Sequence, residues 1–448
     1  MSKTFNKAVF ETFVIPTETF SSMKTDFEKF SYKLTGNYNF GVIVFIVPAK
    51  FSCDSFTAIP IEGWGKKYII FTIYAYSTIS VTTYQDNKIT FNLKACPTVS
   101  KSEDQFIEYQ GRKLVDGDSF DVVLPALKTF ALMLCERVIF GSMTGTEITS
   151  EKIIGVVSGN CYAGTLSFGC NGQMSASQEW GTMDIAAEMM MPVESYGKEF
   201  IMLYMPRRRR QGFHTVTAAF PDTTIQIGNG GGSETFENIV LKDARSNADL
   251  VFTDVRHLKS DKPVLVVYVQ ESQCTRAGNL REKGDPSLTI IIPMNLFYDI
   301  YVWSAPKTDV VKPLGYVIVQ VKKTDRDFLL FDNQPMPPGT KWVDVIGNDE
   351  YTYGDTSIME GLHNVTGSRF FYFGCYIYGL SDYYSYMNPA GFISSEINMP
   401  CTPNRADMQN GDLIDNDCDG SIDEELADGI DNDNDKKVDE DLTRAAPS

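Results

Sequence analysis

The chain has 448 residues and a net charge of −18, but its acidity is local: residues 407–441 carry a charge of −13 and leave only −5 for the rest. Such a body lacks the basic surface of a nucleic-acid-binding protein, so we predict no nucleic-acid partner. No apolar run reaches the roughly 18 residues that cross a bilayer, so we predict no transmembrane segment.

The body has the composition of a β protein. It contains 29 Phe, 22 Tyr and 34 Gly and is rich in Thr, Val and Ile. Alternating runs at 79–84, 215–227, 314–321 and 369–378 read as strands separated by Gly, Asn and Asp turns. We predict an all-β fold of tandem β-sandwich domains, each of about 100 residues, followed by an irregular calcium-binding segment. A β-propeller-like arrangement is the alternative.

The predicted organisation follows from internal repeats. The expected parts are an N-terminal β segment or partial domain at 1–65, β-sandwiches at 66–197, 198–298 and 299–400, acidic repeats at 401–442, and a tail at 443–448. The first residues are not followed by an apolar stretch, so no signal peptide is visible.

One repeat is a proline followed by aromatics four and eight residues later. Its copies are Pro60, Trp64 and Tyr68; Pro192, Tyr196 and Phe200; and Pro293, Phe297 and Tyr301. An Asp precedes each proline by six to eight residues, at positions 54, 184 and 285. We expect the aromatic side chains to pack in the core rather than to form a ligand site. A second repeat matches 148–157 with 258–267, and each copy reads as a polar turn entering a buried strand.

Nine cysteines are present and none forms a Cys-x-x-Cys pair, which argues against structural zinc. Cys161 and Cys170 flank a short loop and are predicted to form a local disulfide. Cys401 and Cys418 are predicted to tie the first acidic loop to the body. Reduced core cysteines are the alternative, and the odd number leaves at least one thiol without an internal disulfide partner.

Two further surface features are functional candidates. The run Arg207, Arg208, Arg209 and Arg210 is expected at a loop tip between strands, where it could contact a polyanion, serve as a basic protease site, or dock onto an acidic tail; a solvated hairpin tip is the plain alternative. Asn364 begins an Asn-Val-Thr sequon and is a glycosylation candidate.

The sequence offers no catalytic constellation. The three histidines at 214, 257 and 363 have no Cys, Asp or Glu at metal-ligand spacing, and no nucleophile-elbow or phosphate-binding motif is present. We therefore predict a protein that is not an enzyme.

The C-terminal end carries two acidic segments with the same carboxylate spacing, sixteen residues apart. Asp at alternate positions of a tight loop wraps around Ca²⁺, and Gly420 allows the sharp turn. An EF-hand would need Glu where Leu426 and Leu442 stand, so neighbouring acids must complete the shell. The predicted calcium ligands are Asp415, Asp417, Asp419, Ser421, Asp423, Glu424 and Glu425 for one ion, and Asp431, Asp433, Asp435, Asp439, Glu440 and Asp441 for the other. Lys436 replaces the glycine in the second copy and predicts a weaker site there; a solvated acidic tail is the alternative.

Ordered motifs between about residues 35 and 396 resemble the IgGFc-binding protein N-terminal domain family. The resemblance is carried by 53–68, 144–161, 192–200, 259–267 and 284–287. The acidic segments are similar to Asp-Asn-Asp-Cys-Asp-Gly metal-binding repeats found beside such domains. This resemblance implies a secreted protein of mucus, matrix or adhesion, without implying antibody binding.

These observations lead to one main hypothesis. We predict a non-enzymatic, secreted structural or adhesive protein whose Ca²⁺-binding repeats order the tail and trigger assembly. Its expected partners are other copies of itself, as a homo-oligomer or filament, and extracellular glycoproteins. A lectin-like module that binds glycans or a protein is the alternative.

Overall fold

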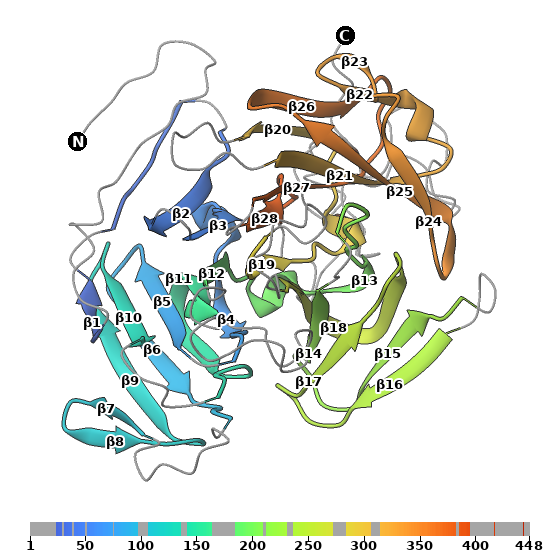
Figure 1. The fold of residues 1–448 in the computed structure, drawn as a ribbon. Helices are drawn as coiled ribbons and strands as arrows, with labels where there is room; N and C mark the ends of the chain where they lie inside the picture. The colour runs from blue at the N-terminus through green and yellow to red at the C-terminus, as the bar shows by residue number, and fades with distance from the viewer. Residues whose placement is uncertain are drawn as a thin grey trace, which may run out of the picture.

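The fold is built from β-strands arranged around a common centre (Figure 1). The computed structural model describes residues 24–28, 31–37, 40–49, 52–74, 76–96, 106–135, 141–163, 184–208, 212–230, 236–271, 284–305, 314–381, 385–394, 416 and 442. Within these residues the helical segments are all short 3₁₀ turns, so the all-β prediction is confirmed. None of the described helical segments is long and apolar enough to span a membrane.

The first unit is a sheet built around one long strand, β11 (Glu147–Ala163). The strand order is β1-β10-β5-β11-β6-β9, and β4 and β12 also pair with β11. Its other strands are β1 (Lys24–Glu28), β4 (Gly65–Ile69), β5 (Ser77–Thr83), β6 (Asn87–Asn92), β9 (Ser119–Leu124), β10 (Thr129–Leu134) and β12 (Asp184–Met189), with a side hairpin of β7 (Ile107–Tyr109) and β8 (Arg112–Leu114).

The second unit repeats this topology around the long strand β18 (His257–Gln270). Its order is β17-β14-β18-β15-β16, with β13 and β19 also on β18, so each strand has a counterpart in the first unit. Its other strands are β13 (Gly197–Ile201), β14 (Phe213–Ala218), β15 (Thr223–Gly228), β16 (Phe236–Leu241), β17 (Asn247–Val251) and β19 (Ser287–Ile290).

In the third unit the long strand is interrupted. Its two halves are β26 (Gly361–Gly367) and β27 (Gly374–Leu380), and they belong to separate sheets ordered β20-β26-β22-β23 and β24-β25-β21-β27-β28. The remaining strands are β20 (Ile300–Ala305), β21 (Leu314–Lys322), β22 (Leu329–Phe331), β23 (Gln334–Pro335), β24 (Lys341–Val345), β25 (Asn348–Ile358) and β28 (Ser385–Pro389), with a 3₁₀ turn η5 (Arg326–Phe328).

Each long strand pairs with one set of strands before a register shift and with another set after it, and its sheet curls there. The first residues of β11 pair with β4 and β6, and those from Ile154 onward pair with β5 and β12. At the shift, the Ser150 hydroxyl donates to the Lys152 carbonyl at 2.7 Å, and Ser260 donates to the Lys262 carbonyl at 2.7 Å in β18. A hydroxyl can satisfy a carbonyl that the disrupted ladder leaves without a partner. The prediction of a polar turn before a strand was therefore wrong, because the strand runs through both segments.

Four strands meet at the centre of the molecule. They are β3 (Ser52–Thr57), which forms a hairpin with β2 (Ile43–Ala49), and the last strand of each unit, β12, β19 and β28. β3 contacts β12, β12 contacts β19, β19 contacts β28 and β28 contacts β3, which closes a cycle. One continuous hydrophobic core extends from Phe56 to Ile393 across all three units.

The proline repeats connect each central strand to the next unit. Pro60, Pro192 and Pro293 each precede a 3₁₀ turn, namely η2 (Ile61–Gly63), η3 (Val193–Ser195) and η4 (Met294–Leu296). Proline fixes its own φ and has no N–H to leave unpaired at the start of a turn. The aromatics that follow are buried, except that Trp64 is half-buried.

Two of these aromatics form hydrogen bonds to the backbone through their hydroxyl groups. Tyr68 accepts the Gly65 N–H at 2.9 Å and donates to the Ile154 carbonyl at 2.5 Å. Tyr301 accepts the Tyr298 N–H at 2.9 Å and donates to the Phe373 carbonyl at 2.5 Å. The same bonds therefore hold the start of the first and third units, as expected for aromatics that serve packing.

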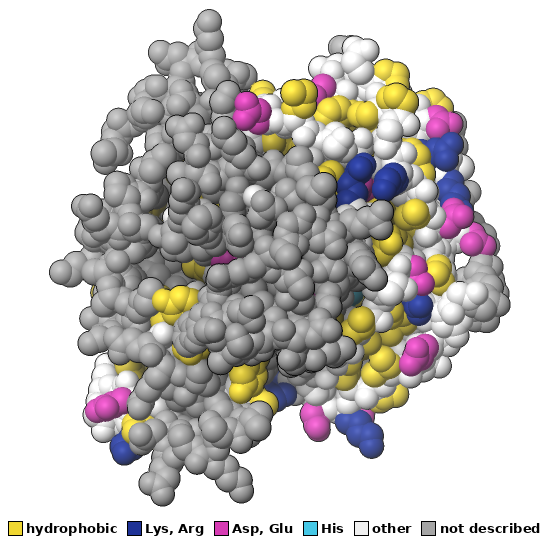
Figure 2. Space-filling model, viewed as in Figure 1, with side chains coloured by type: hydrophobic (Ala, Val, Ile, Leu, Met, Phe, Trp, Pro, Cys, Tyr) yellow, Lys and Arg dark blue, Asp and Glu magenta, His cyan; other side chains and the backbone are white. Residues whose placement is uncertain are grey.

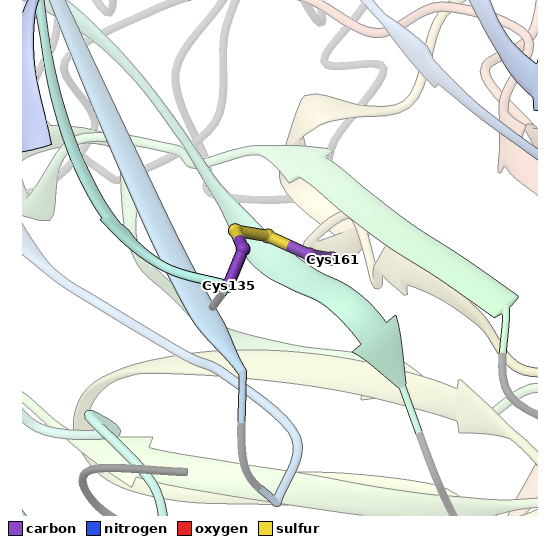
Figure 3. Close-up of a disulfide and its surroundings, with 2 residues drawn as sticks. All are labelled: Cys135 and Cys161. Atoms are coloured by element: carbon purple, nitrogen blue, oxygen red, sulfur yellow. A yellow bond between two sulfur atoms is a disulfide. The ribbon is translucent and has the colours of Figure 1, made fainter. Parts of the chain in front are cut away.

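One disulfide joins Cys135, just after β10, to Cys161 in β11, with their Cα atoms 5.7 Å apart (Figure 3). β5 pairs with both strands and begins at Ser77, so the two cysteines meet where β5 no longer separates its neighbours. The predicted pairing of Cys161 with Cys170 was therefore wrong. Cys170 lies outside the described residues, and so do Cys401 and Cys418.

Candidate functional site

None of the predicted calcium ligands lies within the part of the chain that the structure describes. Of the acidic repeats, the structure describes only Asn416, which is buried, and Leu442. All of the predicted ligands lie outside the described residues: Asp415, Asp417, Asp419, Ser421, Asp423, Glu424, Glu425, Asp431, Asp433, Asp435, Asp439, Glu440 and Asp441. Within the described part of the chain, no three His, Cys, Asp or Glu side chains lie together as a metal site would require.

The arginine run does not form an exposed tip at the two positions that are described. Arg207 pairs with Asp355, at 2.5 Å between Nε and Oδ1, and its guanidinium lies 5.0 Å from the centre of the Tyr316 ring. Arg208 is only 4% exposed and donates to the Glu271 carbonyl at 2.9 Å. The prediction of a solvated loop tip was wrong for Arg208, which is buried. The Arg207 side chain is 23% exposed, but its guanidinium is held in an ion pair with Asp355. Arg209 and Arg210 lie outside the described residues.

The histidines are held in ways that suit structure rather than proton transfer. His214 is buried, its Nε2 accepts the Leu203 N–H at 3.1 Å, and burial lowers its pKa to about 3. Both ring nitrogens of His363 face oxygen atoms, of Asp332 and Met359, each at 2.8 Å. His257 is also buried, with Nδ1 3.2 Å from the Gly347 carbonyl.

Buried carboxylates occupy the centre, where the four inner strands meet. Each of these strands pairs with a neighbour along one edge only, which leaves the N–H groups of the other edge without a ladder partner. The carboxylate of Asp54 on β3 accepts hydrogen bonds from such N–H groups. Its Oδ2 accepts the N–H groups of Ala187 at 2.9 Å and Leu288 at 3.2 Å, and its Oδ1 accepts that of Ser55 at 2.8 Å.

Two acids on β12 extend this pattern around the centre. Asp184 accepts the Cys53 N–H at 3.2 Å, and Glu188 accepts the N–H of Ile290 on β19 at 3.1 Å. On the remaining side, the Ser55 hydroxyl of β3 donates to the Asn388 side chain of β28 at 2.6 Å. Side chains thus replace the backbone ladder between inner strands.

Burial controls the ionisation of this centre. It raises the pKa of Asp54 and Glu188 well above the usual range, although backbone N–H donors oppose the rise in both. It also raises the pKa of the Cys53 thiol, with the charges of Asp54 and Asp184 adding to the effect. Carboxyl groups with raised pKa values can mark catalytic sites. Here both oxygens of Asp54 are occupied by backbone donors, so the cluster holds strands together.

The most distinctive outward-facing feature is apolar and lies on the β20–β26 pair. Ile300, Val302 and Leu362 share one face and are 41%, 55% and 56% exposed. Tyr301 and Trp303, which alternate with them, are buried in the core beneath. Hydrophobic side chains gather at the top of Figure 2, over the strands that Figure 1 labels β22 and β26. We call the three residues the β20–β26 strip; exposed apolar groups of this kind are typical of contact surfaces.

Asn364 lies on this same outward face. It is directly opposite Val302 and two residues from Leu362, and it is half-buried. The sequon is visible in the sequence, but the apolar strip around it is not, because Ile300 and Val302 read as ordinary strand residues.

One comparison with known proteins gives a match that covers most of the chain. The family model described as IgGFc binding protein matches residues 54–379. The match begins at the central Asp54 and extends through all three units into β27. No curated protein matches the chain.

Proposed function

The chain belongs to the IgGFc-binding protein family, and on this basis we propose that it is a secreted structural or adhesive protein whose C-terminal repeats bind Ca²⁺. The family is one of non-enzymatic binding proteins that are typically extracellular. The family match over residues 54–379 is the observation that carries the proposal. The buried carboxylates and bound histidines support it, since their polar atoms serve the scaffold.

The proposed role of calcium rests on the repeated acidic spacing. Asp415, Asp417 and Asp419 recur sixteen residues later as Asp431, Asp433 and Asp435. Oxygen ligands at alternate positions suit Ca²⁺, and bound cations would reduce the repulsion among the carboxylates of 407–441, whose net charge is −13. Ion binding would thereby order the tail and promote contacts between copies of the chain or with extracellular glycoproteins.

Calorimetric titration of Ca²⁺ into the full chain tests this proposal. We expect saturable binding with a dissociation constant on the order of 10⁻⁴ to 10⁻³ M, as for extracellular modules. Asp415→Ala with Asp431→Ala should abolish it, whereas Asp407→Ala, which removes a charge outside the repeats, should leave it almost unchanged. Sedimentation with and without Ca²⁺ then measures self-association. Absence of binding at millimolar Ca²⁺, or equal loss in the Asp407→Ala control, would contradict the calcium role.

A further inference from the structure

We propose that Asn364 is an N-glycosylation site whose glycan covers the β20–β26 strip. The inference extends the proposed secretion to a specific modification. The Asn364-Val365-Thr366 sequon is the only Asn-x-Ser/Thr sequence in the chain. The fold places this sequon beside the exposed apolar side chains of the β20–β26 strip.

The backbone geometry directs the sequon outward. The Asn364 N–H donates to the Asp332 carboxylate at 2.9 Å, and its carbonyl accepts the Asp332 N–H at 2.9 Å. Both polar backbone groups therefore point toward β22, so Asn364 and Val302 form the pair type that exchanges no backbone hydrogen bonds. Side chains are closest in such pairs, so the Asn364 side chain stands directly beside that of Val302.

The amide nitrogen that would carry the sugar is available. Among the described residues, the Asn364 side chain makes no hydrogen bond, whereas its neighbours Val365 and His363 are buried beneath it. Thr366, the third sequon residue, lies on the same outward face, opposite Ile300. All of the groups that define the site are thus on the solvent side of the sheet.

The surroundings explain what a glycan would do there. β20 is the edge strand of its sheet, and an exposed apolar edge favours unwanted pairing with other chains. Asn364 lies across from Val302, which is 55% exposed. It is flanked by Leu362 and Ile300, which are 56% and 41% exposed. A bulky hydrophilic group at Asn364 would cover this strip and block access to the edge.

The test directs the full chain into the secretory pathway of cultured mammalian cells with an added leader peptide. We expect one N-glycan, found at Asn364 by mass spectrometry, retained in Thr366→Ser and lost in Asn364→Gln and Thr366→Val. Because the leader supplies secretion, an unmodified secreted chain would overturn this inference without touching the proposed function, which depends on where the native protein goes.

The covering role is measured on folded glycoprotein, so that no variant needs to fold without its sugar. Enzymatic removal of the glycan should increase binding of an apolar dye and self-association by several-fold. The same treatment of a Val302→Thr, Leu362→Thr double variant should change neither. A glycan whose removal leaves dye binding and association unchanged would overturn the covering role.

Discussion

Gly65 lies against Pro192 so closely that a β carbon on the glycine would stand 2.3 Å from the proline Cβ. Gly197 has the same relationship to Pro293, also at 2.3 Å. The start of each of the first two units is therefore fitted to the proline turn of the unit that follows. Because a side chain cannot enter this space, the glycine is required for close approach rather than for its backbone freedom.

Gly65→Ala and Gly197→Ala should each destabilise the protein by about 1–3 kcal/mol, the usual cost of forcing an extra carbon into a packed contact. Urea unfolding measures the effect. Gly339→Ala is the matched control, because a β carbon there meets no atom within 4 Å. Equal effects at all three positions would show that the contact with proline is not the cause.

Asp54→Ala should be more damaging, since it leaves three N–H groups of the centre without an acceptor. Each orphaned buried donor costs about 1–3 kcal/mol, so we expect a loss of several kcal/mol in the free energy of unfolding. Asp54→Asn keeps one acceptor oxygen, so its free energy of unfolding should lie between those of the native chain and of Asp54→Ala. Asp121→Asn, in an exposed pair with Lys88, should have almost no effect and serves as the control.

The free energy of unfolding should fall with rising pH, and the Asp54 variants test this. Burial raises the pKa of Asp54 and Glu188, so the folded protein holds these protons to higher pH than the unfolded chain does. Their contribution to stability is therefore present below the ordinary carboxyl pKa and is lost as pH rises through the folded values. The fall in unfolding free energy with rising pH should be shallower in Asp54→Ala than in the native chain; an unchanged slope would contradict the raised pKa.

The contribution of His214 to stability should change with pH in the opposite direction. Its pKa is lowered to about 3, so its contribution is fully present above about pH 6.5 and is lost as pH falls toward 3. We expect a slope of up to about 1.4 kcal/mol per pH unit in this window, reduced in His214→Gln. Imidazole NMR signals provide a direct check: protonation of His214 in the folded protein near pH 6 would refute the prediction.

Arg207→Ala should destabilise the fold by about 3–5 kcal/mol at neutral pH, because Asp355 is fully buried and would lose its counter-charge. Tyr378 would still donate to the other carboxylate oxygen, at 2.5 Å. The cost should shrink in acid, where Asp355 takes up a proton. Arg326→Ala, in the exposed pair with Asp327, should cost less than about 0.5 kcal/mol. A reduced affinity for polyanions in a fully stable Arg207→Ala would favour the surface role instead.

Local patterns predicted much of this architecture. Strand composition indicated an all-β fold, and the proline repeats marked the connections at which one unit follows another. Their aromatics could be assigned to packing because large buried rings seldom serve as ligands. The family resemblance also came from ordered local motifs.

Long-range relationships could not be predicted in the same way. The sequence shows an Asp before each repeated proline. The acceptor role of Asp54 could not be predicted, because it depends on Ala187 and Leu288, which are 133 and 234 residues away. The partner of Cys161 depends on where β5 begins, not on the spacing of cysteines. Ser150 and Ser260 looked like turn residues because a hydroxyl serves a turn and a register shift equally well.

The closed cycle of inner strands also constrains how the protein is made. Ser55 on β3 bonds Asn388 on β28, 333 residues later, so the first inner strand emerges from the ribosome long before the last. At about 5–20 residues per second, this gap corresponds to tens of seconds of synthesis. During that time the free edge of β3 and the buried acids of β12 lack their final neighbours. The nascent chain therefore passes through a period of exposure in which chaperones would have to protect it.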